Sequence, residues 1–250
     1  MGATTDGAGA RPAKPLGHKS YGSIPHLPGS RMGPGDHHCH PGQQAICWEK
    51  TRDRHDRVIV TEKLDGSNVA IARVGDDIVA LGRAGYPSET SPYEQHRIFA
   101  TWVAERADRF RRVLLPGVRI VGEWMAQAHA TRYRLTGEPF IAFDVMEGQR
   151  RFAWANAHVV IAEVGLPCAT VLHDGGPCPL SAVLPALDAG GHHGAIDPVE
   201  GAVWRVERRG QFDFMAKWVR PDKRDGLLLP EISGAPPVWN WRPADAARAA

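Results

Sequence analysis

The sequence is poor in the features that mark membrane, secreted and nucleic-acid-coating proteins. None of its apolar runs approaches the length that spans a bilayer, and residues 1–15 lack the apolar core of a secretory signal. The net charge of only +2 excludes a basic coat for nucleic acid, so any phosphate-binding surface must come from local clusters. The four cysteines show no close pairing such as C-x-x-C; they are Cys39, Cys47, Cys168 and Cys178. We therefore expect reduced thiols and a cytoplasmic protein.

What is present is an ordinary globular composition, and the order of its patterns predicts a fold class. The 250 residues are 43% hydrophobic and 23% charged, which suits one large domain or two small ones. Apolar spacing predicts helices from an N-cap at Ser91 to Leu114, over 155–164 and over 180–187. β-branched and alternating runs predict strands at 58–60, 68–74, 78–81, 118–124, 140–145, 201–206 and 212–219. Strands in hairpins with helices between them indicate an α+β fold of antiparallel sheets.

The two ends of the chain differ in composition from the segment between them. Residues 1–20 are rich in Gly, Ala, Thr and Pro, which predicts a flexible N-terminal tail. Residues 21–230 are expected to form one domain. Residues 231–250 form a C-terminal tail in which Trp239 and Trp241 could pack back onto that domain.

Two groups of polar residues outside the strands are best explained as solvated structure. The predicted domain opens with an irregular arm over 21–48, which contains the stretch Asp36-His37-His38-Cys39-His40. Its spacing fits no common zinc pattern, so a polar loop is favoured over a metal site. The predicted helix after Ser91 has a basic face, and a solvated face is favoured over a nucleic-acid contact. The arginines of that face are Arg106, Arg109, Arg111 and Arg112.

The stretch from Val58 to Asn68 is the strongest candidate for chemistry. Its β-branched start predicts a strand, and Asp65-Gly66-Ser67 predicts a tight turn directly after it. Lys63 therefore lies where a buried strand ends, beside a carboxylate. Partial desolvation of an amine there would lower its pKa and free its lone pair for attack. The alternative is an ordinary hairpin with a surface lysine, and this stretch alone does not decide between them.

Further polar residues lie at or near the ends of other predicted strands, in a fixed order along the chain. Arg83 follows one strand, Glu123 lies near the end of another, and Glu200 and Lys217 flank the last hairpin. With Lys63-Leu64-Asp65-Gly66 and the aromatic strand around Phe143, the ordered set over 58–220 resembles the covalent nucleotidyltransferase superfamily of polynucleotide ligases and RNA-capping enzymes. The structural alternative for each residue alone is a charged side chain at an exposed strand end.

Within that superfamily the sequence is most similar to ATP-dependent RNA ligases. Asn68, five places after the lysine, matches an asparagine of those ligases. Residues 221–250 are too few for the OB-fold domain that DNA ligases and capping enzymes carry after the fifth motif, so none is expected. One place departs from the pattern, because Val219 stands where a second lysine is common. Arg220 could substitute for that lysine.

The resemblance implies adenylate transfer in three steps. Lys63 attacks the α-phosphate of ATP, releases pyrophosphate and becomes a lysine–AMP. AMP then moves to the 5′-phosphate of an RNA end, and a 3′-hydroxyl displaces it to seal the strand. The implied partner is RNA with 5′-phosphate and 3′-hydroxyl ends, and the implied process is RNA repair. Nothing in the sequence indicates a membrane or a protein partner.

The resemblance also implies residue roles. Arg83 and Glu123 hold the ribose, Phe143 stacks on adenine, and Glu62 contacts the base edge. Glu200 assists binding of Mg²⁺ or Mn²⁺, which suit carboxylate and phosphate oxygens. The implied catalytic residues are Lys63, Glu200 and Lys217, the last of which neutralises the α-phosphate. The remaining implied ATP-binding residues are Leu64, Asp65 and Asn68.

Two other functions remain open at this point. One is a DNA-sealing or guanylate-transferring relative, and the other is a catalytically silent module that binds nucleotide or RNA ends. For a ligase, exposed basic clusters near predicted turns would supply the RNA surface. These clusters are Arg150-Arg151, Arg208-Arg209 and Lys223-Arg224.

Overall fold

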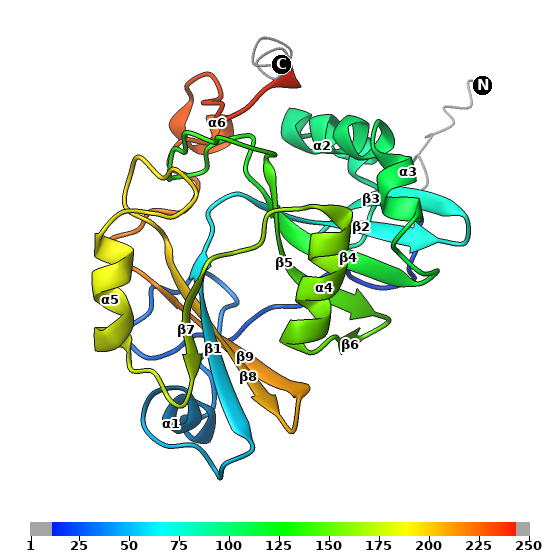
Figure 1. Ribbon diagram of the computed structural model, residues 1–250. Helices are drawn as coiled ribbons and strands as arrows, with labels where there is room; N and C mark the ends of the chain where they lie inside the picture. Colours follow the sequence, from blue (N-terminus) through cyan, green and yellow to red (C-terminus); the bar gives the residue numbers. More distant parts are fainter. Residues whose placement is uncertain (1–11, 244–250) are drawn as a thin grey trace, which may run out of the picture.

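The computed structural model describes residues 12–243, so residues 1–11 and 244–250 of the predicted tails lie outside the described residues. It confirms an α+β fold with two antiparallel sheets (Figure 1). The strands are β1 (Asp56–Lys63), β2 (Ser67–Val74), β3 (Asp77–Gly82), β4 (Val118–Trp124), β5 (Phe140–Glu147), β6 (Arg150–Arg151), β7 (Val171–Gly175), β8 (Gly201–Arg208) and β9 (Gln211–Val219). The helices are α1 (Pro41–Trp48), the 3-10 helix η1 (Ser88–Thr90), α2 (Glu94–Ala104), α3 (Ala107–Arg111), α4 (Trp154–Val164), α5 (Leu180–Asp188) and α6 (Pro230–Ser233).

The turn between β1 and β2 carries the chain from one sheet to the other. β1 belongs to a four-stranded sheet of order β7-β1-β8-β9, and β2 belongs to a five-stranded sheet of order β3-β2-β4-β5-β6. The alternative of an ordinary β1–β2 hairpin is therefore wrong. Gly66 is required in this turn, because a Cβ there would lie 2.6 Å from the Trp124 carbonyl oxygen. The residues after β1 thus lie where the two sheets meet.

An aromatic core holds α2, α3 and α4 against the five-stranded sheet. Phe99 of α2 is fully buried, and its ring centroid lies 5.1 Å from that of Trp124 and 5.7 Å from that of Phe140. Helical spacing of apolar residues places them on one face of α2, while period-two alternation presents the sheet residues to that face. Truncating such a ring, as in Phe99→Ala, typically costs about 3–5 kcal/mol.

A second core lies against the four-stranded sheet under α1 and α5. Val58 and Val60 of β1 and Trp204 of β8 are buried in it, together with Leu27 from the N-terminal arm. The last third of the arm is helix α1, so the prediction of an irregular arm over 21–48 is wrong for 41–48. His40 caps this helix by accepting a hydrogen bond from the Gly42 N–H, in place of the usual hydroxyl or carboxylate.

The single helix predicted from Ser91 to Leu114 is instead two helices, α2 and α3. Arg106 between them has a non-helical backbone (φ −115°, ψ 12°). The break lets Trp102 and Phe110 pack in one core, with ring centroids 6.0 Å apart. Ser91 is not the N-cap, because Pro92 and Tyr93 intervene before α2 begins.

Buried charges join the two sheets. Asp144 of β5 is fully buried, and Arg205 of β8 lies 3.2 Å from its Oδ1. Arg151 pairs with the same carboxylate, and the Tyr21 hydroxyl donates to it over 3.2 Å. Removing one partner of such a network leaves a charge uncompensated, which is strongly destabilising. The network therefore fixes one sheet relative to the other.

The C-terminal segment packs back as the sequence suggested. The Trp241 ring lies 5.7 Å from that of Trp124, and the Asn240 N–H donates to the Ala126 carbonyl over 2.8 Å. Over residues 12–243, no helix combines the length and the apolar character needed to cross a membrane.

Candidate active site

Lys63 is the last residue of β1 and pairs with Glu200. Lys63 lies opposite Gly201 in the β1–β8 ladder, so the residue before β8 comes next to it. Lys63 Nζ donates to Glu200 Oε2 over 2.6 Å, and the two side chains are 22% and 10% exposed. The structure thus brings together the residues predicted as nucleophile and metal ligand.

Burial and charge together set the protonation of this site. Burial alone would lower the pKa of Lys63, but the carboxylates of Glu200 and Glu123 outweigh it and raise that pKa. Burial raises the pKa of Glu123 to about 8, against the opposing effect of Lys63. Burial likewise raises the pKa of Glu200. The expectation of a lowered pKa for Lys63 is therefore wrong for the ion-paired state, in which the amine holds its proton.

Asp65 faces away from the cavity beside Lys63 and holds a neighbouring loop. Its Oδ2 accepts the backbone N–H groups of Ala130 and Thr131 over 3.0 and 2.7 Å. Lys223 Nζ lies 3.0 Å from the same oxygen. Burial alone would raise the pKa of Asp65, but Lys223 lowers it, so the carboxylate is ionised.

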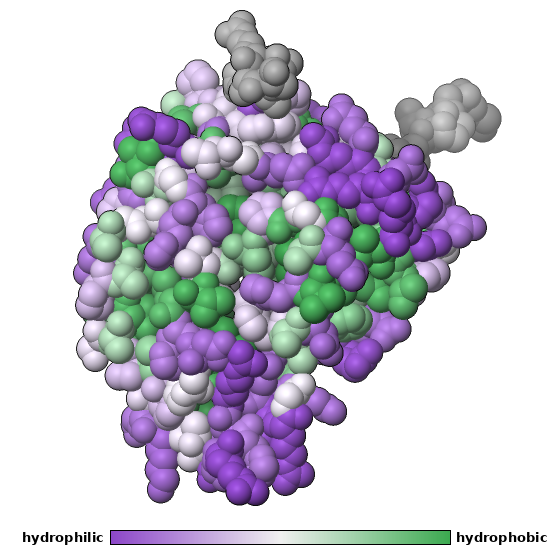
Figure 2. Space-filling model, viewed as in Figure 1, coloured by the Kyte–Doolittle hydropathy of each residue, from purple (hydrophilic) through white to green (hydrophobic). Residues whose placement is uncertain are grey.

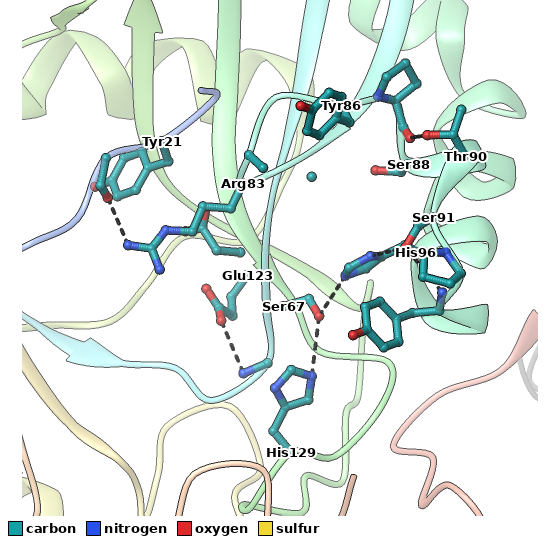
Figure 3. Close-up of a pocket in the computed structure, with 18 of the residues that line it drawn as sticks. Tyr21, Ser67, Arg83, Tyr86, Ser88, Thr90, Ser91, His96, Glu123 and His129 are labelled. Carbon is teal, nitrogen blue, oxygen red and sulfur yellow. Dashed lines mark hydrogen bonds between the residues drawn. The ribbon is translucent and has the colours of Figure 1, made fainter. Parts of the chain in front are cut away.

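A cavity of about 710 Å³ opens beside Lys63, within the usual range of roughly 300–1,000 Å³ for ligand sites. Figure 3 shows Arg83 and Glu123 close to each other on its wall, with Glu123 accepting the Gly66 N–H over 3.2 Å. Both sheets contribute to the wall, so the cavity lies where the β1–β2 turn crosses between them. The predicted site residues that line it are Lys63, Asn68, Arg83, Glu123 and Lys217.

The N-terminal arm, which the sequence analysis placed in the domain but not in the site, contacts two of the residues that line the cavity. Arg83 donates to the Gly22 carbonyl over 3.2 Å, and the Lys217 carbonyl accepts the Leu27 N–H over 2.8 Å. Asp36 reaches Lys217 with its Oδ1 3.7 Å from Nζ. Burial and the charge of Lys63 lower the pKa of Lys217.

Five predicted site residues are not among those that line the cavity: Asp65 and Glu200, described above, and Glu62, Leu64 and Phe143. Neighbouring residues of a strand point to opposite faces, so Glu62 points away from Lys63. It is 2% exposed, and its Oε2 accepts the His192 N–H over 3.0 Å. Phe143 packs edge-on against Tyr21, with ring centroids 5.5 Å apart. Leu64 is buried beside Phe143 in a small apolar cluster.

A polar network on the opposite wall was missed by the sequence reasoning. Ser67 Oγ donates to Gln95 Oε1 over 2.9 Å and lies 3.2 Å from His96 Nε2 and 3.3 Å from His129 Nε2 (Figure 3). Burial and the neighbouring His129 lower the pKa of His96 to about 4, and burial lowers that of His129. This wall is therefore uncharged near neutral pH, unlike the wall formed by Arg83, Glu123 and the two lysines.

The residues present fit a divalent cation only with help from a ligand. Among residues 12–243, no three His, Cys, Asp or Glu side chains converge as a metal cluster. In the arm, Asp36 Oδ2 lies 3.1 Å from His26 Nε2, and the pair contacts Lys217. Glu200 offers carboxylate oxygens, which hard cations prefer, so phosphate oxygens of a nucleotide would have to complete the coordination.

The predicted basic clusters are largely paired inside the chain. On the face shown in Figure 2, hydrophilic residues cover the end that carries the β8–β9 turn. Within that turn region, Arg208 pairs with Asp53 and Asp56. Arg151 and Lys223 pair with Asp144 and Asp65. The prediction of three free basic clusters is therefore wrong for these members.

The basic face of the helices after Ser91 is also paired within the chain. Salt bridges engage three of its arginines, Arg106, Arg109 and Arg111.

Arg220 does not take the place of the lysine that is absent at Val219. Its side chain donates to the Val199 carbonyl over 3.0 Å and pairs with Asp188 at 2.5 Å. Val219 is itself buried. The cation after β9 that reaches the β1–β2 turn is Lys223 instead.

Comparison with known proteins agrees with this arrangement. The family model described as RNA ligase matches residues 56–219, more than half of the chain. The chain belongs to the RNA ligase family. The match begins at β1 and ends with β9, so it spans both sheets and every strand-end residue described above. No curated protein gives a match.

Solved RNA ligases share the fold of this family member. A Naegleria gruberi RNA ligase mutant with ATP and Mn is 17% identical, with a TM-score of 0.53 over 80% of this chain and 60% of that chain. A second mutant of that ligase, with AMP and Mn, is 16% identical, with a TM-score of 0.52 over 70% and 53%. An archaeal ATP-dependent RNA ligase, form 1, is 20% identical, with a TM-score of 0.49 over 80% and 48%. The chain thus spans about half the length of the solved ligases that it matches.

Proposed function

We propose that this protein is an ATP-dependent RNA ligase that works through a covalent lysine–AMP on Lys63. The observation that carries the proposal is the placement of Lys63. It ends β1 at the wall of a cavity that Arg83, Glu123 and Lys217 also line, and it lies 2.6 Å from Glu200. Cations and carboxylates around one lysine are what transfer of a charged phosphoryl group needs. The similar Naegleria gruberi RNA ligase structure, which contains ATP and Mn, supports this choice of nucleotide.

In the first step, Lys63 Nζ loses a proton and its lone pair attacks the α-phosphorus of ATP. The bond from that phosphorus to the bridging oxygen breaks, and the electron pair leaves with pyrophosphate. Lys217, on the same cavity wall, would neutralise the charge that develops on the α-phosphate. Burial and the charge of Lys63 lower the pKa of Lys217. The negative charge of a bound phosphate would raise that pKa again and favour the protonated ammonium.

A divalent cation, Mg²⁺ or Mn²⁺, would be held by Glu200 and would supply charge neutralisation at the phosphates. Glu200 Oε2 now accepts from Lys63, so a cation held by Glu200 would share that carboxylate with the lysine. Among the neighbouring charges, Glu200 raises the pKa of Lys63 the most, so Lys63 would hold its proton less tightly if Glu200 served another cation.

The remaining nucleotide contacts are proposals of the same kind. Arg83 and Glu123 would hold the ribose, and Asn68 would contact the nucleotide from the same cavity. Phe143 and Glu62 would contact adenine only after a local rearrangement, since Tyr21 and the His192 backbone now occupy them. Leu64 and Asp65 would act by shaping the turn that carries Lys63.

The proposed substrate is RNA with a 5′-phosphate and a 3′-hydroxyl, as in RNA repair. AMP would pass from Lys63 to the 5′-phosphate, and the 3′-hydroxyl would then attack that phosphate and expel AMP. We further propose that residues 21–230 are the catalytic domain. The match to the RNA ligase family model and the similarity to a solved RNA ligase support RNA rather than DNA as the substrate.

Labelling of the pure protein tests this proposal. Incubation with ATP labelled at the α-phosphate and with Mg²⁺ or Mn²⁺ should leave one label on the chain after denaturing electrophoresis. Peptide mapping should place it on Lys63 through an acid-labile phosphoramidate. GTP in place of ATP distinguishes a guanylate-transferring enzyme, and absence of any label indicates a silent binding module. Sealing of RNA ends that carry a 5′-phosphate, but not a 5′-hydroxyl, tests the end chemistry.

A further inference from the structure

The lysine beyond β9 links three segments at the back of the catalytic turn. Lys223 is 9% exposed, and its Nζ lies 3.0 Å from Asp65 Oδ2. The same ammonium donates to the Thr131 hydroxyl and lies 3.5 Å from the Pro198 carbonyl oxygen. These partners belong to the β1–β2 turn, to the loop after β4 and to the segment that leads into Glu200. One cation therefore contacts three parts of the chain that each adjoin the site.

Its partner Asp65 holds the turn that follows Lys63. The Asp65 carboxylate accepts two backbone N–H groups from the loop after β4, and its own N–H donates to the Tyr133 hydroxyl over 3.2 Å. The next residue, Gly66, donates its N–H to Glu123 Oε1. The backbone at Asp65 and Gly66 is thus anchored, directly after Lys63, which lines the cavity.

Lys223 itself does not belong to the cavity. It is absent from the lining, whereas Lys63 and Lys217 both line it. A direct contact with the nucleotide is therefore not the way in which this lysine would act. A buried ion pair with well-formed hydrogen bonds is also weak support for stability alone, because apolar replacements are often as stable.

On the basis of the proposed function, we propose that Lys223 is a positioning residue for adenylate transfer. It is the cation after β9 that reaches the β1–β2 turn, and it does so through its ion pair with Asp65. It neutralises the Asp65 carboxylate, and it thereby leaves Glu200 as the carboxylate that Lys63 pairs with. It also fastens the segment before Glu200 to the turn that carries Lys63, so that nucleophile and metal ligand keep their spacing.

Lys223→Met should slow Lys63 labelling at least tenfold at saturating ATP, and the KM for ATP should stay within about twofold, because the lysine does not touch nucleotide. Lys223→Arg should recover part of the rate, since it keeps the charge. In an Asp65→Asn background, Lys223→Met should cost little more, because residues that act as a unit are not additive. Thermal unfolding identifies the temperature range in which every variant is folded, and labelling is measured there.

Arg132→Met is the matched control. Arg132 pairs with Asp197 at 2.7 Å, which ties the same two loops together at the surface, with the arginine 52% exposed. It should label at the rate of the unaltered protein. Equal losses in both variants would show that any tether between these loops suffices, and would overturn the proposal. A raised KM with an unchanged rate for Lys223→Met, or an unchanged rate and KM, would also overturn it. Failure of the unaltered protein to label would instead refute the proposed function.

Discussion

The Lys63–Glu200 pair predicts that substitution of Lys63 lowers both the stability of the protein and its labelling by ATP. Lys63→Met removes the amine and leaves the Glu200 carboxylate, 10% exposed, without its 2.6 Å partner. Breaking a buried pair costs about 3–5 kcal/mol, and the 22% exposure of Lys63 reduces this to about 2–3 kcal/mol. For a chain of this size that is a fall in Tm of roughly 4–12 °C. Covalent labelling by ATP should be lost entirely.

The stability that Lys63→Met loses should increase as the pH rises. Burial holds the pKa of Glu200 above its ordinary value, and removal of Lys63 raises it further. A carboxyl with a raised native pKa binds more protons in the folded than in the unfolded state, so stability falls as pH rises above about 4.3. The Tm difference between Lys63→Met and the unaltered protein should therefore grow between pH 5 and pH 8. Thermal unfolding followed by circular dichroism at both pH values measures it.

A second substitution separates the two effects. In the double variant Lys63→Met with Glu200→Gln no buried charge is left unpaired, so most of the lost Tm should return while labelling stays absent. Arg57→Met serves as the control. Arg57 lies on β1, as Lys63 does, and pairs with Asp174 of β7. Both side chains are well exposed, and such pairs contribute about 0–1 kcal/mol. A Lys63→Met deficit that is equal at both pH values, or a double variant no more stable than the single one, would refute the reasoning.

Three further outcomes are expected. Lys63→Arg should give no covalent AMP, because arginine keeps its proton, whereas Lys217→Arg should retain part of the labelling that Lys217→Ala loses; single-turnover labelling compares them. Because the carboxylates of Glu200 and Glu123 raise the pKa of Lys63, the labelling rate at fixed metal should rise with pH from 6 to 9, and a flat profile would contradict this. Sealing of a nicked duplex with RNA on the 3′-hydroxyl side should exceed sealing of all-DNA, and should fall with salt more steeply than labelling does. Equal sealing of both duplexes would remove the RNA assignment.

The parts of the fold that sequence could predict are those set by neighbours in the chain. The β1–β2 turn follows from Asp65-Gly66-Ser67, and α4 and α5 were expected within one residue of their observed ends because each is followed closely by glycine. The sequence predicted a helix that includes α2, but the predicted N-cap at Ser91 and the predicted end at Leu114 were wrong. The break at Arg106 depends on how Trp102 and Phe110 fit one core, which helical spacing does not encode.

The candidate site divides in the same way. Lys63, Arg83, Glu123 and Lys217 could be found because each lies in a short motif beside a strand, and the structure brings all four to one cavity. The pairing of Lys223 with Asp65 could not be predicted, because the two residues are far apart in the sequence. The pKa of Lys63 was predicted in the wrong direction for a related reason. Burial was visible in the strand pattern, whereas the pairing with Glu200 depends on the register of β1 with β8.

The docked N-terminal arm has a consequence for the order of folding. Its Ser20 and Tyr21 N–H groups donate to the Arg83 carbonyl, but the Leu27 N–H needs the Lys217 carbonyl on β9. On a ribosome, the segment around Leu27 must therefore wait for β9, which is made much later. Closing so long a loop is slow, and it comes late in assembly. An unfinished chain would hold Lys63 and Arg83 without the part of the cavity wall that Lys217 of β9 supplies, so the proposed labelling of Lys63 would begin only after β9 has joined its sheet.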